Sequence, residues 1–236
     1  GDAVALSLLH GIHLKDINYI QIHPTTLYSK EKGRRFLISE SVRGEGAVLL
    51  NAKGERFVDE LLPRDVVSQA IHAQMEMDHR DYVWLSVVHL GAEKIQKRFP
   101  HIYQHCLEKG YDITKEPIPV TPAQHYFMGG VAVDLESCTS MPHLYAVGET
   151  ACNGVHGKNR LASNSLLESL VFAKRAAKSL QKTIGQIDFM PMPTDLSAYE
   201  DTQALAQKYR TLVLNEIKRR DASFYDQWCH DGSQCG

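Results

Sequence analysis

The sequence predicts a mixed fold of helices and sheet, class α+β (α/β), divided between domains. Residues 19–27 and 36–50 are rich in β-branched and apolar side chains, which is typical of strands. From Asp65 onward, apolar residues recur at helical spacing. Residues 143–149 predict a short buried strand, which is followed by a loop rich in glycine and asparagine and then by a further helical stripe. This last order can present backbone N–H groups at the start of a helix to a ligand.

The remaining elements follow from the same patterns. Residues 1–12 predict a helix already under way, with Gly11 near its end, and this abrupt start favours a chain that lacks preceding sequence. Residues 51–54 predict a turn, and three prolines with a glycine pair make 116–134 an extended connector. We expect further helices over 91–99, 101–109, 166–180 and 197–219, the last with a capping box formed by Ser197 and Glu200.

Composition excludes several classes of protein. Lys and Arg number 26 and Asp and Glu 28, so no net field would concentrate nucleic acid or an anionic membrane surface. The sequence shows neither an apolar run long enough to cross a bilayer nor a signal peptide. Its five cysteines are odd in number and include no C-x-x-C pair, which argues against a disulfide framework and a zinc site. We expect a cytoplasmic protein without a metal.

The loop over 148–169 is the first candidate site. Glycines 148, 154 and 157 permit close backbone approach, Ser163 and Asn164 can cap the following helix, and Ser165 and Leu166 place N–H groups at its positive end. An anion or an electron-rich ring could bind there. A purely structural loop fits the same residues equally well.

Histidines and arginines in otherwise strand-like or turn-like segments form the second candidate site. A small dicarboxylate needs several such donors, because each carboxylate is best held by charge-assisted hydrogen bonds. Taken singly, each of these residues also fits a surface charge or a buried structural histidine, and Glu40 and Glu45 fit ordinary ion-pair partners of Arg43. The donors are His23, Arg43, Arg64, His125 and Arg160.

Several segments, in this order, resemble the succinate dehydrogenase and fumarate reductase flavoprotein superfamily. They are IHPTTLY, SESVRGEGAVLLNAKGERFVDE, LPRDVVSQAI, PAQHYFMGGVAVD and GVHGKNRLASNSLLESL, and they cover most of residues 1–184. Within the superfamily, HPTTLY, LLPRDVVSQAI and GKNRLASNSLLE are most similar to the L-aspartate oxidase family.

The resemblance implies an FAD-binding domain that is interrupted by a capping domain, with the substrate held over the flavin. It assigns 17–126 to the capping domain, 1–16 and 127–184 to the FAD-binding domain, and 195–236 to the start of a truncated carboxy-terminal helical domain. The sequence contains no G-x-G-x-x-G fingerprint after a strand. We therefore expect the chain to be a fragment that lacks the amino-terminal dinucleotide-binding half and, by itself, binds FAD weakly or not at all.

The resemblance also implies roles for individual residues. Arg64 matches the arginine that donates or accepts a proton beside the substrate. The substrate carboxylates would be held by His23, His125 and Arg160, with Ser39 and Glu40 close by. Such an enzyme oxidises L-aspartate to iminoaspartate by hydride transfer to the flavin, which oxygen or fumarate reoxidises, and the product leads to quinolinate and NAD. Quinolinate synthase is thus a candidate partner.

For the cofactor, the resemblance implies contacts with FAD from Asp2, Glu149, Ser165 and Leu166. His156 either faces the flavin or packs in the interior. Ala3 stands where the family usually has glycine, which puts the geometry around Asp2 in doubt.

Two other functions remain open at this point. A soluble fumarate reductase or succinate dehydrogenase flavoprotein would use the same arginine and the same carboxylate-binding residues on a substrate without an amino group. A non-catalytic partner that needs a separately encoded FAD-binding half is the second alternative.

Overall fold

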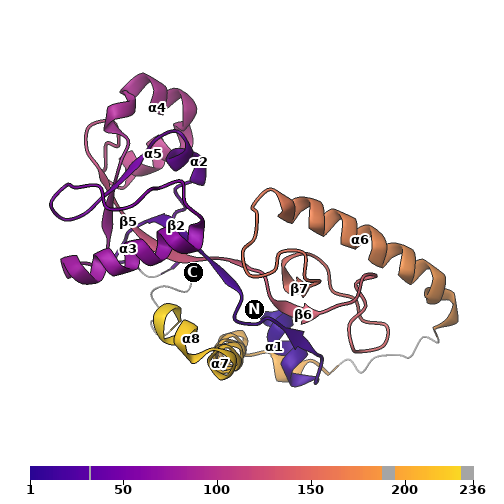
Figure 1. Ribbon diagram of the computed structural model, residues 1–236. Coiled ribbons are helices and arrows are strands. Elements are labelled where there is room, and N and C mark those ends of the chain that lie inside the picture. Colours follow the sequence, from indigo (N-terminus) through magenta and orange to yellow (C-terminus); the bar gives the residue numbers. More distant parts are fainter. Residues whose placement is uncertain (32, 188–194, 230–236) are drawn as a thin grey trace. The chain divides into compact units, whose positions relative to one another are not determined.

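The computed structural model describes residues 1–31, 33–187 and 195–229 (Figure 1). These form two compact units, one of residues 22–125 and one of residues 1–21 with the described residues after 125. Both contain helices and strands, so the predicted mixed class is confirmed. The proline-rich segment 189–194 and the final residues 230–236 lie outside the described residues.

A four-stranded sheet in the order β2-β5-β4-β3 organises the unit 22–125. Its pairs β3–β4 and β4–β5 are antiparallel, with Leu49 opposite Leu85 and Val83 opposite Val120. The predicted strand at 19–27 is confirmed as β2, and the expected extended connector contributes β5. The strands are β2 (Ile20–Leu27), β3 (Val48–Leu50), β4 (Val83–Ser86) and β5 (Ile118–Phe127).

Helix α3 (Arg64–Asp78) supplies one side of the core of this unit. Val67 and Ile71, one helical turn apart, are fully buried in the same cluster as Leu49 and Val120 of the sheet, and Figure 1 shows α3 beside β2 and β5. The predicted helical stripe is therefore confirmed. The other predicted helices appear as α4 (Ala92–Arg98) and α5 (Pro100–Glu108), preceded by the 3₁₀ helix η1 (Val88–Leu90).

The strand predicted over 36–50 is wrong for most of its length. Only β3 and a single bridge from Leu37 to Thr26 are sheet-like, and the middle forms the short helix α2 (Glu40–Gly44). Ser39 caps this helix by accepting a hydrogen bond from the Ser41 backbone N–H. Local capping therefore overrides the strand preference of the neighbouring apolar residues. The predicted turn at 51–54 is confirmed by the hydrogen bond from the Gly54 N–H to the Asn51 carbonyl.

A three-stranded sheet in the order β1-β6-β7 lies in the other unit. Strand β1 (Leu14–Lys15) is antiparallel to β6 (Gly130–Ala132), which is parallel to β7 (Ala151–Cys152). The predicted first helix is α1 (Asp2–Leu9), and Gly11 follows it with φ of 65°. The strand predicted at 143–149 is wrong, because this segment makes one bridge, Cys138 to Tyr145, before the 3₁₀ helix η2 (Gly148–Thr150).

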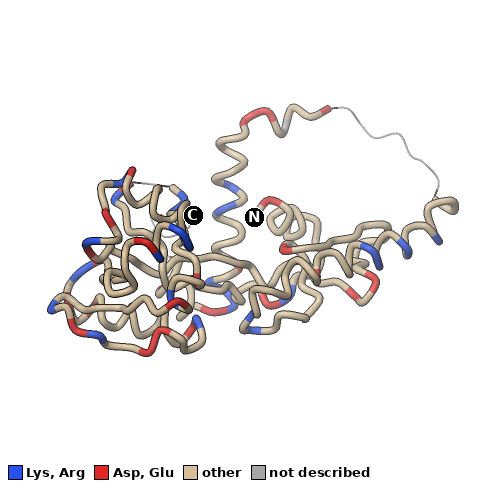
Figure 2. The backbone as a smooth tube through the Cα atoms, turned by 90° about the horizontal axis from the view of Figure 1, so that it is seen from above, with Lys and Arg blue, Asp and Glu red and all other residues tan. Residues whose placement is uncertain are grey.

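Three further helices belong to this unit: α6 (Asn164–Thr183), α7 (Thr202–Arg220) and α8 (Ala222–Trp228). The 3₁₀ helices η3 (Ile184–Gln186) and η4 (Ser197–Tyr199) accompany them. Helix α7 packs against α1. Lys and Arg recur along the second half of α6, where the helix dipole favours cations (Figure 2). No helix in the described part of the chain is long and apolar enough to cross a membrane.

Two predicted helix caps are wrong. Ser163 occupies the N-cap position of α6 with helical dihedrals, φ of −63° and ψ of −21°, and makes no side-chain cap hydrogen bond. An N-cap residue needs a non-helical backbone to turn its side chain toward the free N–H groups. The expected capping box of Ser197 and Glu200 is replaced by Asp201, which accepts a hydrogen bond from the Ala204 N–H and begins α7 later.

Gly129 and Gly130 allow two backbone segments to approach closely. A Cβ atom on Gly129 would lie 1.9 Å from the Asp16 carbonyl oxygen, and one on Gly130 would lie 2.3 Å from the Thr150 carbonyl oxygen. Gly130 also has φ of 134°, a region that side chains rarely allow. The three-stranded sheet thus depends on the absence of side chains at this pair.

We predict that Gly129→Ala lowers the free energy of unfolding by about 1–3 kcal/mol, the cost typical of overpacking, because backbone atoms must move to admit the methyl group. Urea denaturation followed by circular dichroism measures the change. Gly185→Ala is the control, since a Cβ there meets no atom within 4 Å. Equal stability of the two variants would contradict the steric argument.

Candidate active site

A pair of histidines, of which His23 is buried, is the first part of the candidate site. His23 lies on β2 with only 1% of its surface exposed, and its ring meets that of His125 on β5 edge to face, with centroids 5.3 Å apart. Nδ1 of His23 accepts a hydrogen bond from the Thr25 N–H at 3.2 Å. Among the described residues, Nε2 of His23 has no hydrogen-bond partner.

The imidazole of His23 is neutral. Burial, together with the charges of Arg64, His125 and Arg43, lowers its pKa from 6.5 to about 2. A neutral imidazole carries one proton, and Nδ1 acts as an acceptor, so the proton is on Nε2. His23 therefore offers one buried N–H donor that can bind a ligand oxygen.

Two arginines beside His23 share one carboxylate. Arg64, the first residue of α3, donates from Nε and Nη2 to Oε2 of Glu40, the Nε contact measuring 3.0 Å. Oε1 of Glu40 lies 3.6 Å from Nη2 of Arg43. Arg43 is 2% exposed and donates from Nη1 to the Glu60 carbonyl at 2.7 Å. Burial lowers the pKa of Arg43, and the negative charge of Glu40 opposes this.

Ser39 has a structural role in this unit, as the cap of α2. Its hydroxyl caps α2 by accepting from the Ser41 N–H, and it also donates to the Ser41 hydroxyl at 3.2 Å. Through α2, Ser39 fixes the helix that carries Glu40 and Arg43. A direct contact between Ser39 and a substrate stays a prediction.

Arg160 lies in the other unit, at the centre of a second group. Its Nη1 donates to Oε1 of Gln21 at 2.9 Å, and the Gln21 amide returns a 2.9 Å hydrogen bond to the Arg160 carbonyl. The guanidinium stacks 3.8 Å from the centre of the Tyr126 ring, and Nε donates to the Ser165 hydroxyl. These contacts fix the plane of the guanidinium, which is the group expected to bind a carboxylate.

His156 packs inside this second group. Its ring meets that of Tyr126 edge to face, with centroids 5.6 Å apart, and its Nε2 lies 4.0 Å from Oε2 of buried Glu168. Glu168 also accepts hydrogen bonds from Asn153 and Ser169. Burial lowers the pKa of His156. A contact between His156 and the flavin stays a prediction.

The residues around the start of α6 fit part of a site for a flat, anionic cofactor. The side chain of Ser163 does not cap this helix, and the first two N–H groups, those of Asn164 and Ser165, donate to the Leu161 and Ala162 carbonyls at 3.0 and 3.4 Å. Leu166 is 73% exposed on the first turn, and Leu167 and Leu170 beside it are also exposed. Apolar side chains next to a positive helix end suit an aromatic ring that carries electron-rich oxygens.

Asp2 and Glu149 are the other two residues that are expected to contact FAD, and the structure describes the surroundings of both. Asp2 is exposed in the first turn of α1. Glu149 lies on η2 and accepts a hydrogen bond from the Phe127 N–H at 2.9 Å, so it fixes the strand next to Tyr126. Contacts of Asp2, Glu149, Ser165 and Leu166 with FAD stay predictions.

The structure brings His23, His125, Arg64 and Glu40 together in the unit 22–125, whereas Arg160 and the four cofactor residues belong to the other unit. The sequence reasoning missed Gln21 and Tyr126. The sequence gives no signal for Gln21, because Gln21, His23 and Thr25 stand at alternate positions of β2 as residues on an exposed face would, whereas the structure buries all three.

Comparison with known proteins identifies the family. The family model described as "FAD binding domain" matches residues 1–166. The chain belongs to this family. FAD is therefore its expected cofactor, as the sequence predicted.

Curated relatives are about half identical to this chain. An L-aspartate oxidase of Clostridium perfringens is 50% identical over 236 residues, which are 100% of this chain and 53% of the relative. An L-aspartate oxidase of Clostridium acetobutylicum is 53% identical over 92% of this chain and 50% of its own length. The chain thus spans about half the length of these relatives.

Solved structures of related flavoproteins resemble the fold. A quinol-fumarate reductase with menaquinol molecules has a TM-score of 0.73 and 34% identity, over 91% of this chain and 40% of its own. The Sdh1 complex of Mycobacterium smegmatis with UQ1 has a TM-score of 0.69 and 30% identity, over 96% and 44%.

We predict that His23 makes the stability of the protein depend on pH in acid. Its pKa is about 2 when folded and 6.5 when exposed, so below pH 6.5 the unfolded chain binds a proton that the folded chain does not. The free energy of unfolding should therefore fall as pH falls from 6.5 toward 2, with up to about 1.4 kcal/mol per pH unit from this group.

Urea denaturation at several pH values between 6.5 and 4.5 measures this slope. His23→Gln, which cannot take up the proton, should give a shallower slope than the unmodified protein. His101→Gln, a change at an exposed histidine of the same unit, is the control and should keep the original slope. An unchanged slope in His23→Gln would exclude a buried neutral imidazole.

Proposed function

We propose that this chain carries the substrate-binding part of an FAD-dependent L-aspartate oxidase, which oxidises L-aspartate to iminoaspartate with oxygen or fumarate as the electron acceptor. The observation that carries this proposal is the buried neutral His23 beside His125, Arg43 and Arg64. This cluster combines a hydrogen-bond donor with guanidinium groups, which suits a small dicarboxylate. The identity to curated L-aspartate oxidases supports the choice of substrate.

The substrate carboxylates are bound by His23, His125 and Arg160 in this proposal. The Nε2–H of His23 donates to one carboxylate oxygen, and a buried donor left without a partner costs about 1–3 kcal/mol, so the ligand removes that cost. Arg160 is held in one plane by Gln21 and Tyr126, which reduces the entropy lost on binding. Ser39 and Glu40 complete the binding residues. Ser39 acts by capping α2, and Glu40 acts by holding Arg43 and Arg64 in place.

Arg64 is the proposed proton donor or acceptor beside the substrate. Its guanidinium is fixed by Glu40 at the start of α3, and its side chain is 10% exposed, so bulk water has little access to it. A fixed and shielded group can transfer a proton within one geometry, which general acid–base catalysis requires.

Asp2, Glu149, Ser165 and Leu166 are the proposed residues that hold FAD. When bound, the flavin accepts the hydride from the substrate. The chain's own contribution is the start of α6 and the apolar surface at Leu166 on one side, and the polar group around Arg160 and Ser165 on the other.

We further propose the domain assignment that the resemblance implies, with a capping domain at 17–126, FAD-binding segments at 1–16 and 127–184, and a helical domain from 195. The boundaries between the two compact units lie at 21/22 and 125/126, which supports this division. A cytoplasmic role in quinolinate formation for NAD synthesis, with quinolinate synthase as a candidate partner, follows from the proposed product.

A full-length hybrid can be made by putting this chain in place of the matching half of the Clostridium perfringens relative. We predict that this hybrid oxidises L-aspartate. Hydrogen peroxide release and trapping of the imine measure turnover. The unmodified relative is the positive control. Fumarate reduction or succinate oxidation without any turnover of L-aspartate would favour the fumarate reductase alternative, which the structural neighbours keep open.

We predict that Arg64→Lys in this hybrid lowers kcat for L-aspartate by about 10²–10⁴-fold while FAD stays bound, because lysine cannot reproduce the two-point contact with Glu40 or the position of the transferred proton. Flavin absorbance after gel filtration and steady-state kinetics separate these effects. Arg80→Lys, an exposed change in the same unit, is the control. Normal turnover in Arg64→Lys would remove Arg64 from the mechanism.

A further inference from the structure

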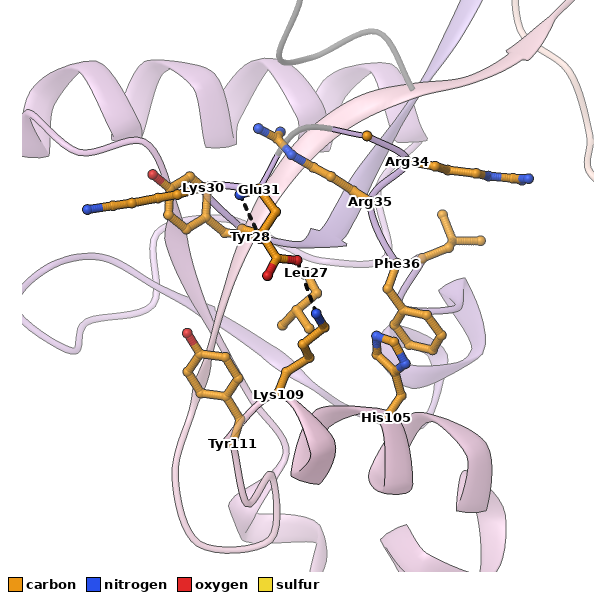
Figure 3. A pocket seen from close by; sticks show the side chains of 13 residues that line it. Leu27, Tyr28, Lys30, Glu31, Arg34, Arg35, Phe36, His105, Lys109 and Tyr111 are labelled. Carbon is orange, nitrogen blue, oxygen red and sulfur yellow. Dashed lines mark hydrogen bonds and ion pairs between the residues drawn. The ribbon is translucent and has the colours of Figure 1, made fainter.

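We propose that the unit 22–125 contains a second ligand site, which binds a small organic polyanion. The site is a cavity of about 820 Å³ between the end of β2, the segment that follows it, and α5. Figure 3 shows its side chains, among them Tyr28, Arg35, Phe36, His105 and Lys109. His23, Arg64 and His125 do not line it, so this proposal does not depend on the proposed oxidase activity.

The lining residues carry an excess of positive charge. The lining includes four cations, Lys30, Arg34, Arg35 and Lys109, and one carboxylate, that of Glu31, which pairs with Lys109 at 3.1 Å. Among the described lining residues, three cations therefore remain without a carboxylate, and Asp81, which lies outside the lining, acts on Arg35. A concave wall with this balance attracts an anion more strongly than an open surface does, because low-dielectric walls focus the field.

Arg35 supplies the specific donor. Its Nε and Nη1 are buried and have no hydrogen-bond partner among the described residues. Burial lowers the pKa of Arg35, while the side chain of Asp81 opposes this and accepts a hydrogen bond from Tyr28 at 3.1 Å. The Nε–H and Nη1–H groups point to different sides of the guanidinium, so each can donate to a separate acceptor atom. Ligand oxygens there would satisfy donors that the protein leaves unused.

Aromatic rings supply a second kind of contact. Phe36 and His105 stack with centroids 3.7 Å apart and an angle of 17° between their planes. Tyr28 and Tyr111 also line the cavity, and Arg35 lies 5.9 Å from the centre of the Tyr28 ring. Flat carbon surface beside cations suits an organic anion rather than chloride or another bare ion. Phosphate esters and polycarboxylates share this chemistry.

The test is isothermal titration of the purified protein with pyrophosphate, with a nucleoside monophosphate and with citrate, each against sodium chloride at equal ionic strength. We expect one saturable site for at least one of these probes. The nucleotide and citrate arms distinguish a phosphate ester from a polycarboxylate as the natural ligand. Failure of every probe to bind saturably would overturn the proposal.

Variants of Arg35 and Arg80 test whether the probe binds in this cavity. Arg35→Gln should weaken binding about tenfold or more, because it removes a charged hydrogen-bond donor. Arg80→Gln removes the same charge elsewhere in this unit and should leave affinity close to normal. If circular dichroism shows that Arg35→Gln does not fold, Arg35→Lys is the deciding variant. It keeps the positive charge but loses the Nε–H and Nη1–H donors. Unchanged affinity in the folded Arg35 variant, or equal loss in Arg80→Gln, would overturn the proposal.

Discussion

The carboxylate of Glu40 is the interaction on which the candidate active site depends. Two guanidinium groups, those of Arg43 and Arg64, lie near the buried ring of His23, and like charges in such surroundings repel unless an anion lies between them. Glu40 contacts both arginines from α2, and Ser39 caps that helix. The same positive charges help to keep His23 neutral. A short helix with a serine cap therefore fixes the position of Arg64, whose charge adds to the effect of burial in keeping His23 neutral.

The second group of residues, around Arg160, orients its arginine by hydrogen bonds and by an aromatic contact. The plane of the Arg160 guanidinium is set by its hydrogen bonds to Gln21 and Ser165 and by the face of Tyr126. A guanidinium fixed in this way loses less conformational entropy when it binds an anion than a mobile one does. The two units thus each contain an arginine with a defined orientation.

Much of the fold could be predicted from sequence, because α3 and β2 carry clear periodic patterns that match their burial. The segments 36–47 and 143–149 could not, since their outcome depends on local hydrogen bonds, the Ser39 cap and a single bridge at Tyr145, which compete with apolar composition. In the candidate site, His23, His125 and Arg64 were found through family motifs. Gln21 and Arg35 were not, because a buried amide and an unsatisfied guanidinium are recognised only from their neighbours in space.

The sheet β1-β6-β7 joins segments from both sides of the unit 22–125, through the close approach of Asp16 to Gly129. Closing so long an intervening chain is entropically costly unless that chain is already compact. The neighbouring strands β2 and β5 hold the two ends of this insertion side by side once its own core has formed. The contiguous unit can therefore fold first during synthesis, and its completion prepares the discontinuous unit for assembly.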